Sequence, residues 1–203
     1  INKLSSGVSV NAEDSPVDNE SEFGVLKTSC VYSNVFNVEE NKKVFSEEYD
    51  RVKCPIKGNS IIISRMNTPE LIGASGYVER NYENIFLPDR LWITEFEDIT
   101  NICVKWMSYI FRSTRFKKVL SNLATGTSSS MKNLTKDDLL SVKIPFCGVK
   151  EQTMISLELD DCIKKISLNI NLHKRKLDLV KEYRQSLISS VVTGKIRITK
   201  DML

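Results

Sequence analysis

Residues that could perform acid–base or nucleophilic chemistry are few in this chain, and their spacing does not suit it. His173 is the single histidine and lies far along the sequence from any serine in a strained turn. The chain contains no GxSxG, Walker or GxGxxG motif, and no aromatic-proline tetrapeptide of an adenine methyltransferase. The densest acidic pairs, Asp137-Asp138 and Asp160-Asp161, lie in helical contexts typical of solvated surface. We therefore predict that the chain has no catalytic residues and is not an enzyme by itself.

The cysteines do not form a metal-binding pattern. Five occur, at positions 30, 54, 103, 147 and 162, without any CxxC spacing. With one histidine beside them, we predict no zinc or other metal site, and no cofactor. An odd, scattered set of thiols suits a reducing cytoplasm, where each is a small buried hydrophobe. No run of 18 apolar residues exists, so no membrane partner is expected. No secretory signal is visible, but the chain begins at Ile1, and we expect its true start to lie upstream.

Charge is unevenly distributed, although the net charge is only +3. Residues 1–100 contain 10 Lys and Arg against 17 Asp and Glu, whereas residues 101–143 contain 8 against 2. The basic segment is a candidate face for a polyanion. A solvated helix surface explains the same charges equally well. Its main cations are Lys105, Arg112, Arg115, Lys117, Lys118 and Lys132.

The longest regular element is predicted at the carboxyl end of the chain. Neither Gly nor Pro interrupts residues 151–193, and a helix of about 40 residues is roughly 60 Å long. Apolar residues recur there in the 4-3-4-3 spacing of a coiled-coil seam. The apolar seam positions are Leu159, Ile163, Ile166, Ile170, Leu177, Val180, Leu187 and Val191. His173 and Arg184 also fall on the seam, either as partly exposed positions or as polar residues that set its register.

Such a helix is too long to bury its seam against a domain of about 150 residues, so part of the seam must meet another long helix. That helix lies in a second copy, in a further portion of the same protein or in another subunit.

The preceding residues favour a mostly antiparallel β unit with added helices. The opening residues, 1–21, are expected to be loop, and short strands are expected in residues 23–96. They include the apolar patches at 31–36, 61–63, 77–78 and 91–93. Helical spacing follows over residues 99–123 with a break at 112–115, then a short helix at 136–140 and a last strand at 142–144. We predict an α+β fold: a β-rich domain over residues 1–148 and a long coiled-coil helix with a short tail over 149–203.

The junction between domain and helix resembles a known family. Gly126-Thr127 forms a turn, Ile144-Pro145 ends a strand, and Glu151-Gln152 opens the long helix, as in type I restriction-modification specificity subunits. The segment 183–196, with its stop at Gly194, resembles the helix end of that family. Upstream, the match is looser: 57–65 resembles a Gly-Asp-Ile-Leu strand with Asn59 in the place of Asp, and Gly73 falls where that family often has a glycine in its next strand.

The resemblance implies what the chain does. It would be a non-catalytic DNA-specificity subunit whose target recognition domain contacts one half of a bipartite target in double-stranded DNA. Methyltransferase subunits, with a restriction subunit as a further possible partner, would dock on it and bring S-adenosylmethionine chemistry to a flipped adenine. Full family members carry two recognition domains and two long helices. This chain has one of each, so it resembles a half-length protein that pairs with a second copy, or one half of a longer parent.

The candidate DNA contacts follow from this resemblance. Loop residues are favoured because helices and strands must pack. Arg and Asn can contact base edges through two hydrogen bonds, while Lys and Ser more often hold phosphates. The candidates are Lys27, Ser29, Arg65, Asn67, Arg80, Thr127, Ser128, Ser129 and Lys132. Each of these residues could instead be ordinary surface.

Two other classes of function remain open. One is a coiled-coil assembly protein that does not bind DNA, which fits the seam and the acidic first hundred residues. The other is a degenerate nuclease-methylase fragment, against which the missing motifs argue.

Overall fold

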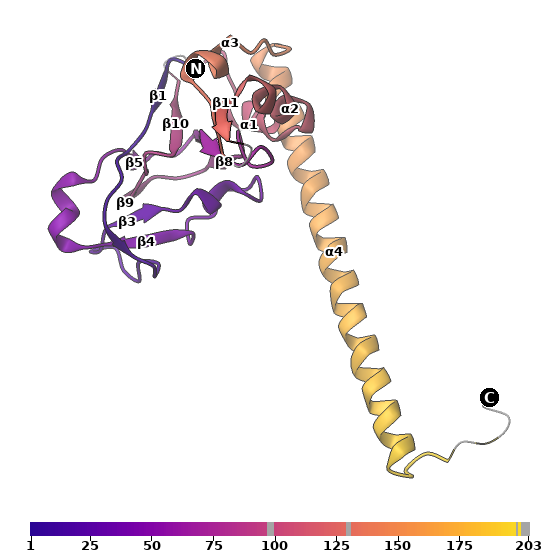
Figure 1. The fold of residues 1–203 in the computed structure, drawn as a ribbon. Helices are drawn as coiled ribbons and strands as arrows, with labels where there is room; N and C mark the ends of the chain where they lie inside the picture. The colour runs from indigo at the N-terminus through magenta and orange to yellow at the C-terminus, as the bar shows by residue number, and fades with distance from the viewer. Residues whose placement is uncertain (97–99, 129–130, 198, 200–203) are drawn as a thin grey trace. The chain divides into compact units, whose positions relative to one another are not determined.

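The computed structural model describes residues 1–96, 100–128, 131–197 and 199 (Figure 1). The chain forms two compact units, Ile1–Ser156 and Leu157–Leu203. The first contains the sheets and the short helices, and the second contains most of the long helix α4 (Val149–Val192). The predicted α+β class, with largely antiparallel sheets followed by a long helix, is confirmed. The domain boundary at residue 148 stays a prediction.

Three sheets build the first unit. A four-stranded sheet has the order β1 (Lys3–Ser5), β10 (Leu91–Glu95), β6 (Ser60–Ser64), β8 (Ser75–Val78). A five-stranded sheet has the order β2 (Ala12–Glu13), β4 (Asn41–Val44), β3 (Gly24–Leu26), β9 (Tyr82–Phe86), β5 (Pro55–Ile56). A small sheet has the order β11 (Thr125–Ser128), β12 (Met131–Asn133), β7 (Met66–Asn67). Pairing is antiparallel except between β3 and β9, which run parallel.

Strand β6 lies between the two hydrophobic cores of this unit. Successive side chains of a strand point to opposite faces. Accordingly Ile61 and Ile63 belong to one buried cluster and Ile62 to the other. Each of the three is at most 1% exposed. The apolar run predicted as a buried strand is therefore buried on both faces.

Three sequence-based predictions are wrong in detail. The opening segment is not all loop, since β1 pairs with β10 through backbone groups that a polar sequence supplies as well as an apolar one. The 31–36 patch is not a strand: it follows a 3₁₀ helix, η1 (Thr28–Val31), and Asn34 turns the chain with a φ of 59°. Residues 142–144 form no strand, because Val142 and Ile144 pack on the first core without pairing in a ladder.

Helices α1 (Val104–Arg112) and α2 (Thr114–Leu123) meet at a sharp corner, as the sequence predicts. Ser113 ends α1 and caps α2, with its hydroxyl accepting a hydrogen bond from the Phe116 backbone N–H at 3.2 Å. The rings of Phe111 and Phe116 pack across the corner with centroids 4.7 Å apart. Helix α3 (Lys136–Ser141) follows, with a capping box between Thr135 and Asp138.

The first turns of α4 are fastened to the first unit by Gln152, whose side chain is fully buried. Its Oε1 accepts from the Cys103 backbone N–H at 2.8 Å, and its Nε2 donates to the Cys147 carbonyl at 2.6 Å. One turn later, the buried Ser156 hydroxyl lies 3.5 Å from Cys103 Sγ. Because both the oxygen and the nitrogen of the buried Gln152 amide are bonded, the side chain holds the backbone at Cys103 and at Cys147 in place.

The other end of α4 is closed by Gly194, the stop that the sequence predicts. Gly194 has a φ of 75°, and its N–H donates to the Val191 carbonyl at 3.1 Å. The Ile196 N–H donates to the Ser190 carbonyl at 3.0 Å. These bonds satisfy carbonyls that the helix leaves unpaired, in the manner of a glycine C-cap.

Candidate nucleic-acid interface

The small sheet brings together several candidate DNA contacts from distant parts of the sequence. Arg65 immediately precedes β7, which contains Asn67, and Lys132 on β12 is the register partner of Asn67. Thr127 and Ser128 belong to the neighbouring strand β11, so the turn predicted at Gly126-Thr127 is wrong, because this segment pairs with β12. Ser129 lies outside the described residues. Strand pairing thus places five of the nine candidates on or beside one sheet.

Arg65 is held in place by its own backbone and side chain. Its N–H donates to the Arg90 carbonyl at 3.1 Å, and its carbonyl accepts from the Leu134 N–H at 2.8 Å. The side-chain Nε donates to the Asp89 carbonyl at 2.7 Å, and the guanidinium lies 5.9 Å from the centroid of the Trp92 ring. An arginine fixed through Nε keeps the two terminal nitrogens that can bind a guanine edge or a phosphate.

Asn67 is engaged inside the domain. Only 8% of it is exposed. Its Nδ2 donates to the Tyr32 hydroxyl at 2.9 Å and to the Ser64 hydroxyl at 3.2 Å, while Oδ1 accepts from the Thr68 N–H at 2.9 Å. These contacts orient the amide within the protein and join β7 to the segment after η1.

Tyr32 is the residue of this region that the sequence did not single out. Its hydroxyl lies 2.8 Å from Thr28 Oγ1 as well as 2.9 Å from Asn67 Nδ2, so it links η1 to the small sheet. The available signal was a tyrosine inside an apolar patch, which we assigned to a strand. A tyrosine there needs a partner for its hydroxyl, and that requirement points to a polar neighbour.

The hairpin of β11 and β12 depends on Gly126. A Cβ atom at this position would lie 2.3 Å from the Met131 carbonyl oxygen, so only glycine allows the two strands to approach. Lys132 on the same hairpin donates from Nζ to the Ala124 carbonyl at 3.2 Å. This bond ties the hairpin to the end of α2.

Lys27 and Ser29, at the start of η1, are paired with acidic side chains. Lys27 Nζ lies 3.1 Å from Asp14 Oδ1, and the Ser29 hydroxyl donates to Glu40 Oε2 at 2.5 Å. The neighbouring lysines, Lys27 first and then Lys42, lower the pKa of Asp14. A phosphate that bound here would have to compete with these carboxylates.

Arg80 lies in the turn between β8 and β9, with its guanidinium 5.0 Å from the centroid of the Tyr82 ring. Hydrogen bonding to Tyr82 raises the pKa of Arg80, so the side chain stays charged. It lines a polar hollow of about 400 Å³ together with Glu20, Asn81, Tyr82, Glu83 and Asn84. No side-chain hydrogen bond, ion pair or ring contact found in the described part of the chain joins Arg80 to the small sheet.

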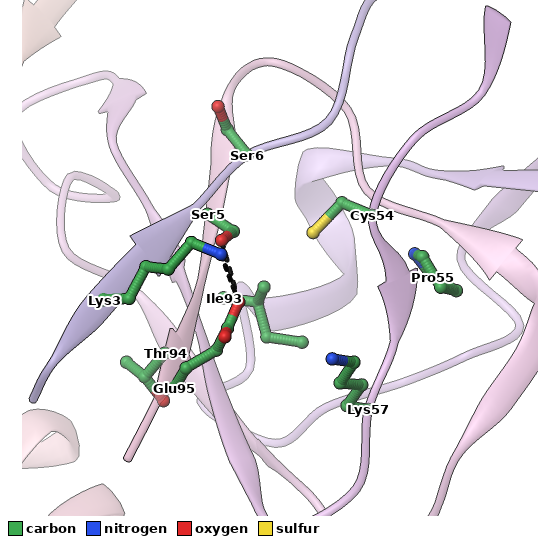
Figure 2. Close-up of a pocket in the computed structure, with 9 residues that line it drawn as sticks. All are labelled: Lys3, Ser5, Ser6, Cys54, Pro55, Lys57, Ile93, Thr94 and Glu95. Carbon is green, nitrogen blue, oxygen red and sulfur yellow. Dashed lines mark hydrogen bonds and ion pairs between the residues drawn. The ribbon is translucent and has the colours of Figure 1, made fainter. Parts of the chain in front are cut away.

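A separate cavity of about 270 Å³ lies between β1, β10 and the segment before β6 (Figure 2). Figure 2 shows the Lys3–Glu95 ion pair on one side of this cavity, between register partners of β1 and β10. Its nitrogen–oxygen distance is 3.4 Å. The Ser5 hydroxyl also donates to Glu95 Oε1 at 2.9 Å. Burial, and then the charge of Glu95, raise the pKa of the Cys54 thiol, which therefore stays protonated and a poor nucleophile. None of the candidate DNA contacts lines this cavity.

The predicted helix-pairing residues lie along α4, and most are exposed. Ile166, Leu177 and Val180 are 57%, 56% and 55% exposed, and Ile163, Ile170 and Leu187 are also exposed. Leu159 and Val191, near the two ends, are half-buried. The seam positions His173 and Arg184 are exposed as well. A stripe of large apolar side chains open to water along a helix is typical of an interaction surface.

Two further findings concern the described residues only. They contain no cluster of three or more His, Cys, Asp or Glu side chains that could hold a metal ion. They also include no helix that is long and apolar enough to span a membrane.

The combination of a β-rich domain and a long helix is also found in known proteins. No protein-family model matches the chain. In sequence it is similar to the type I restriction enzyme EcoEI specificity subunit of Escherichia coli, with 24% identity over 165 residues. That match covers 81% of this chain and 27% of the relative, so the chain spans about a quarter of the relative's length.

Solved structures share the fold. The type I restriction-modification S subunit from M. genitalium aligns with a TM-score of 0.55 and 18% identity, over 93% of this chain and 44% of that one. The HsdS subunit from Thermoanaerobacter tengcongensis aligns with a TM-score of 0.60 and 14% identity, over 94% and 47%. A chain from a structure of the type I restriction-modification system aligns with a TM-score of 0.63 and 14% identity, over 92% of this chain and 42% of that one. The resemblance to type I specificity subunits is therefore confirmed in sequence and in fold.

Proposed function

We propose that this chain is a DNA-recognition component of a type I restriction-modification system. In this proposal it is a non-catalytic specificity subunit, or half of one, that contacts one half of a bipartite target in double-stranded DNA. The sequence match to the EcoEI specificity subunit carries the proposal. The structural matches support it because they cover more than nine-tenths of the chain and so extend over both units.

Among the candidate contacts, Arg65 is best suited to base recognition. Its Nε is bonded and its guanidinium is positioned over Trp92, so little conformational entropy is lost when the terminal nitrogens bind. Lys132, the register partner of Asn67 on β12, is suited to a phosphate. Asn67 has its amide occupied inside the domain, so a contact to adenine would require those bonds to be exchanged.

In this proposal the exposed seam of α4 pairs with a second long helix, from another copy of the chain or from a longer parent. Its 44 residues would span about 66 Å, comparable to about 19 base pairs at roughly 3.4 Å each. Two recognition domains held apart by paired helices would contact two half-sites, with helix length setting the gap. Methyltransferase and restriction subunits would dock on the same scaffold.

The test selects duplexes from a random library with the full chain and then measures binding at two salt concentrations. We expect a preferred sequence and an affinity that falls steeply with salt, because each phosphate contact releases counterions. Arg65→Ala should weaken the preferred duplex by about 1–3 kcal/mol, roughly 5- to 150-fold, and a scrambled duplex much less. Arg175→Ala, the same change on exposed α4, is the control.

Each outcome has a defined meaning. Equal losses on both duplexes would reassign Arg65 to the DNA backbone. An affinity that is absent or independent of salt would contradict DNA recognition. It would favour the second candidate, an assembly protein without DNA, which the acidic character of residues 1–100 supports.

A further inference from the structure

The corner between α1 and α2 is a rigid element of the first unit. Phe111 and Phe116 are 3% and 6% exposed, and their rings pack against each other across it at an interplanar angle of 42°. Ser113 caps the second helix, and the Ser113 N–H donates back to the Ile110 carbonyl at 3.0 Å. Four cations lie between and beside these residues: Arg112, Arg115, Lys117 and Lys118, which we call the corner cations. Arg115 and Lys118 are exposed, and Arg112 and Lys117 are half-buried.

The sequence around the corner cations is free of acidic residues. Residues 101–123 contain no Asp or Glu at all. The fifth cation of this stretch, Lys105, forms an ion pair with Glu79 at 3.7 Å. In the ranges that the structure describes, none of the corner cations forms an ion pair, and Arg112 instead lies 5.2 Å from the centroid of the Tyr109 ring. Lysines elsewhere in the first unit do have acidic partners: Lys27 and Lys42 pair with Asp14, and Lys43 pairs with Glu22.

The positive charges of the corner cations repel one another in the folded chain, which lowers its stability. Burial, and then the positive charge of Arg112, lower the pKa of Lys117. The first turn of α2 contains no acidic residue, although the amino end of a helix favours negative charge. Cations crowded beside a helix amino terminus destabilise the free protein slightly. An anion placed there would relieve both the mutual repulsion and the unfavourable dipole.

The same helix is fastened to the candidate interface. Ser121 Oγ on α2 donates to the Pro69 carbonyl at 2.9 Å, two residues after Asn67. Lys132 on the small sheet donates to the Ala124 carbonyl at the end of α2. The corner and the small sheet are therefore parts of one packed unit. DNA bound at the sheet would have a fixed relation to the corner.

We propose that the corner cations form a sequence-independent contact with the phosphate backbone of duplex DNA. The inference rests on the proposed function and extends it to a surface outside the predicted contact set. Several neighbouring cations suit a polyanion better than a single phosphate ion, which one or two of them would neutralise. Duplex DNA presents one charge for about every 1.7 Å of axis, so several phosphates can be bound together. The corner would set affinity, and the residues of the small sheet would set sequence preference.

The main experiment compares the full chain with Arg115→Gln/Lys118→Gln, two exposed positions where the change leaves the Phe111–Phe116 packing intact. We expect the slope of log affinity against log salt to fall by about 2, with equal loss on preferred and scrambled duplexes. Lys53→Gln/Lys57→Gln removes the same charge at exposed positions on either side of β5, whose Ile56 belongs to the other hydrophobic core, and should leave the slope nearly unchanged.

A second variant separates binding from folding. Lys117→Glu places an acid beside Arg112 and in the amino-terminal half of α2, so the melting temperature should hold or rise while DNA affinity falls at least tenfold. A lower melting temperature with unchanged affinity would assign the corner a structural role. Unchanged slopes in both corner variants, with wild-type binding intact, would overturn the inference. Loss of salt-dependent binding in the wild type would overturn the proposed function and this inference together.

Discussion

The two units of this chain treat their apolar residues in opposite ways. In the first unit, Ile61, Ile62 and Leu91 are essentially inaccessible to water, and even a polar side chain such as Gln152 is buried with its partners. Along the second unit, Ile166, Leu168 and Leu179 are 57%, 60% and 56% exposed. The first unit thus buries its apolar side chains within itself, whereas α4 keeps a row of large apolar side chains exposed.

The largest expected effect tests the proposed pairing of two copies through the seam of α4. In that pairing the mass in solution is about twice 23.1 kDa, and Ile166→Glu/Leu177→Glu, which places two charges on the seam, should reduce self-association by more than 100-fold and return the mass to 23.1 kDa. A wild-type mass of 23.1 kDa would contradict self-pairing. Sedimentation equilibrium measures the mass. Leu168→Glu/Leu179→Glu is the matched control, because these leucines are as exposed but lie off the seam. Equal effects of both pairs would show that the predicted seam is not the pairing face.

The next effect sharpens the contrast in burial. Ile62→Ala removes a fully buried side chain from a packed core and should lower the free energy of unfolding by about 2–5 kcal/mol. The equivalent truncation Leu168→Ala on exposed α4 should change it by no more than about 0.5 kcal/mol. Urea denaturation followed by tryptophan fluorescence reports the first unit through Trp92 and Trp106. If both truncations cost the same, α4 would be packed in solution.

A smaller effect is expected where α4 joins the first unit. Gln152→Leu keeps the volume but leaves the Cys103 N–H and the Cys147 carbonyl without their partner. Leaving such groups unpaired costs about 1–3 kcal/mol, measurable in the same denaturation experiment. The neighbouring exposed change Glu151→Gln is the control. A stable Gln152→Leu protein would show that the apolar contacts of α4, and not this amide, fasten the helix.

The smallest effect depends on pH. The Ser5 hydroxyl, and then Lys3, lower the pKa of Glu95 below its ordinary 4.5. A carboxyl with a depressed folded pKa stabilises the protein above its unfolded pKa and loses that contribution as the pH falls through the folded value. We therefore expect stability to decline below about pH 4.5 and this part of the decline to vanish in Glu95→Gln. Thermal melts at intervals between pH 3 and pH 7 measure it, and parallel curves for both proteins would contradict it.

Much of the fold follows from periodicity in the sequence. The seam spacing predicted α4, and the triple isoleucine predicted β6, because long regular patterns depend on local chemistry alone. The corner at Ser113 was also visible as a polar break between two amphipathic runs. Strands β1 and β2 were not predicted from the sequence, because a short polar segment becomes a strand only when a partner strand such as β10 lies beside it. The 142–144 segment shows the opposite case: its apolar residues were predicted to form a strand, but they pack on a core without pairing to another strand.

The candidate interface was less predictable. Pairing of β7 with β12 brings Arg65 and Lys132 together across nearly seventy residues, and the residue types alone do not specify that pairing. The amide of Asn67 is turned inward by the Tyr32 hydroxyl, a partner more than thirty residues away. A sequence identifies side chains able to bind DNA, but their availability is decided by which of them the fold already uses.

The pleat of β6 has a consequence for how this domain can diversify. Its three isoleucines are shared between both cores, so the strand is indispensable, yet its side chains never reach the surface. The turns around it can therefore exchange residues, lengthen or shorten without altering the support beneath them. Under the proposed function, the DNA preference would change through these turns, while the two cores that β6 joins would stay the same.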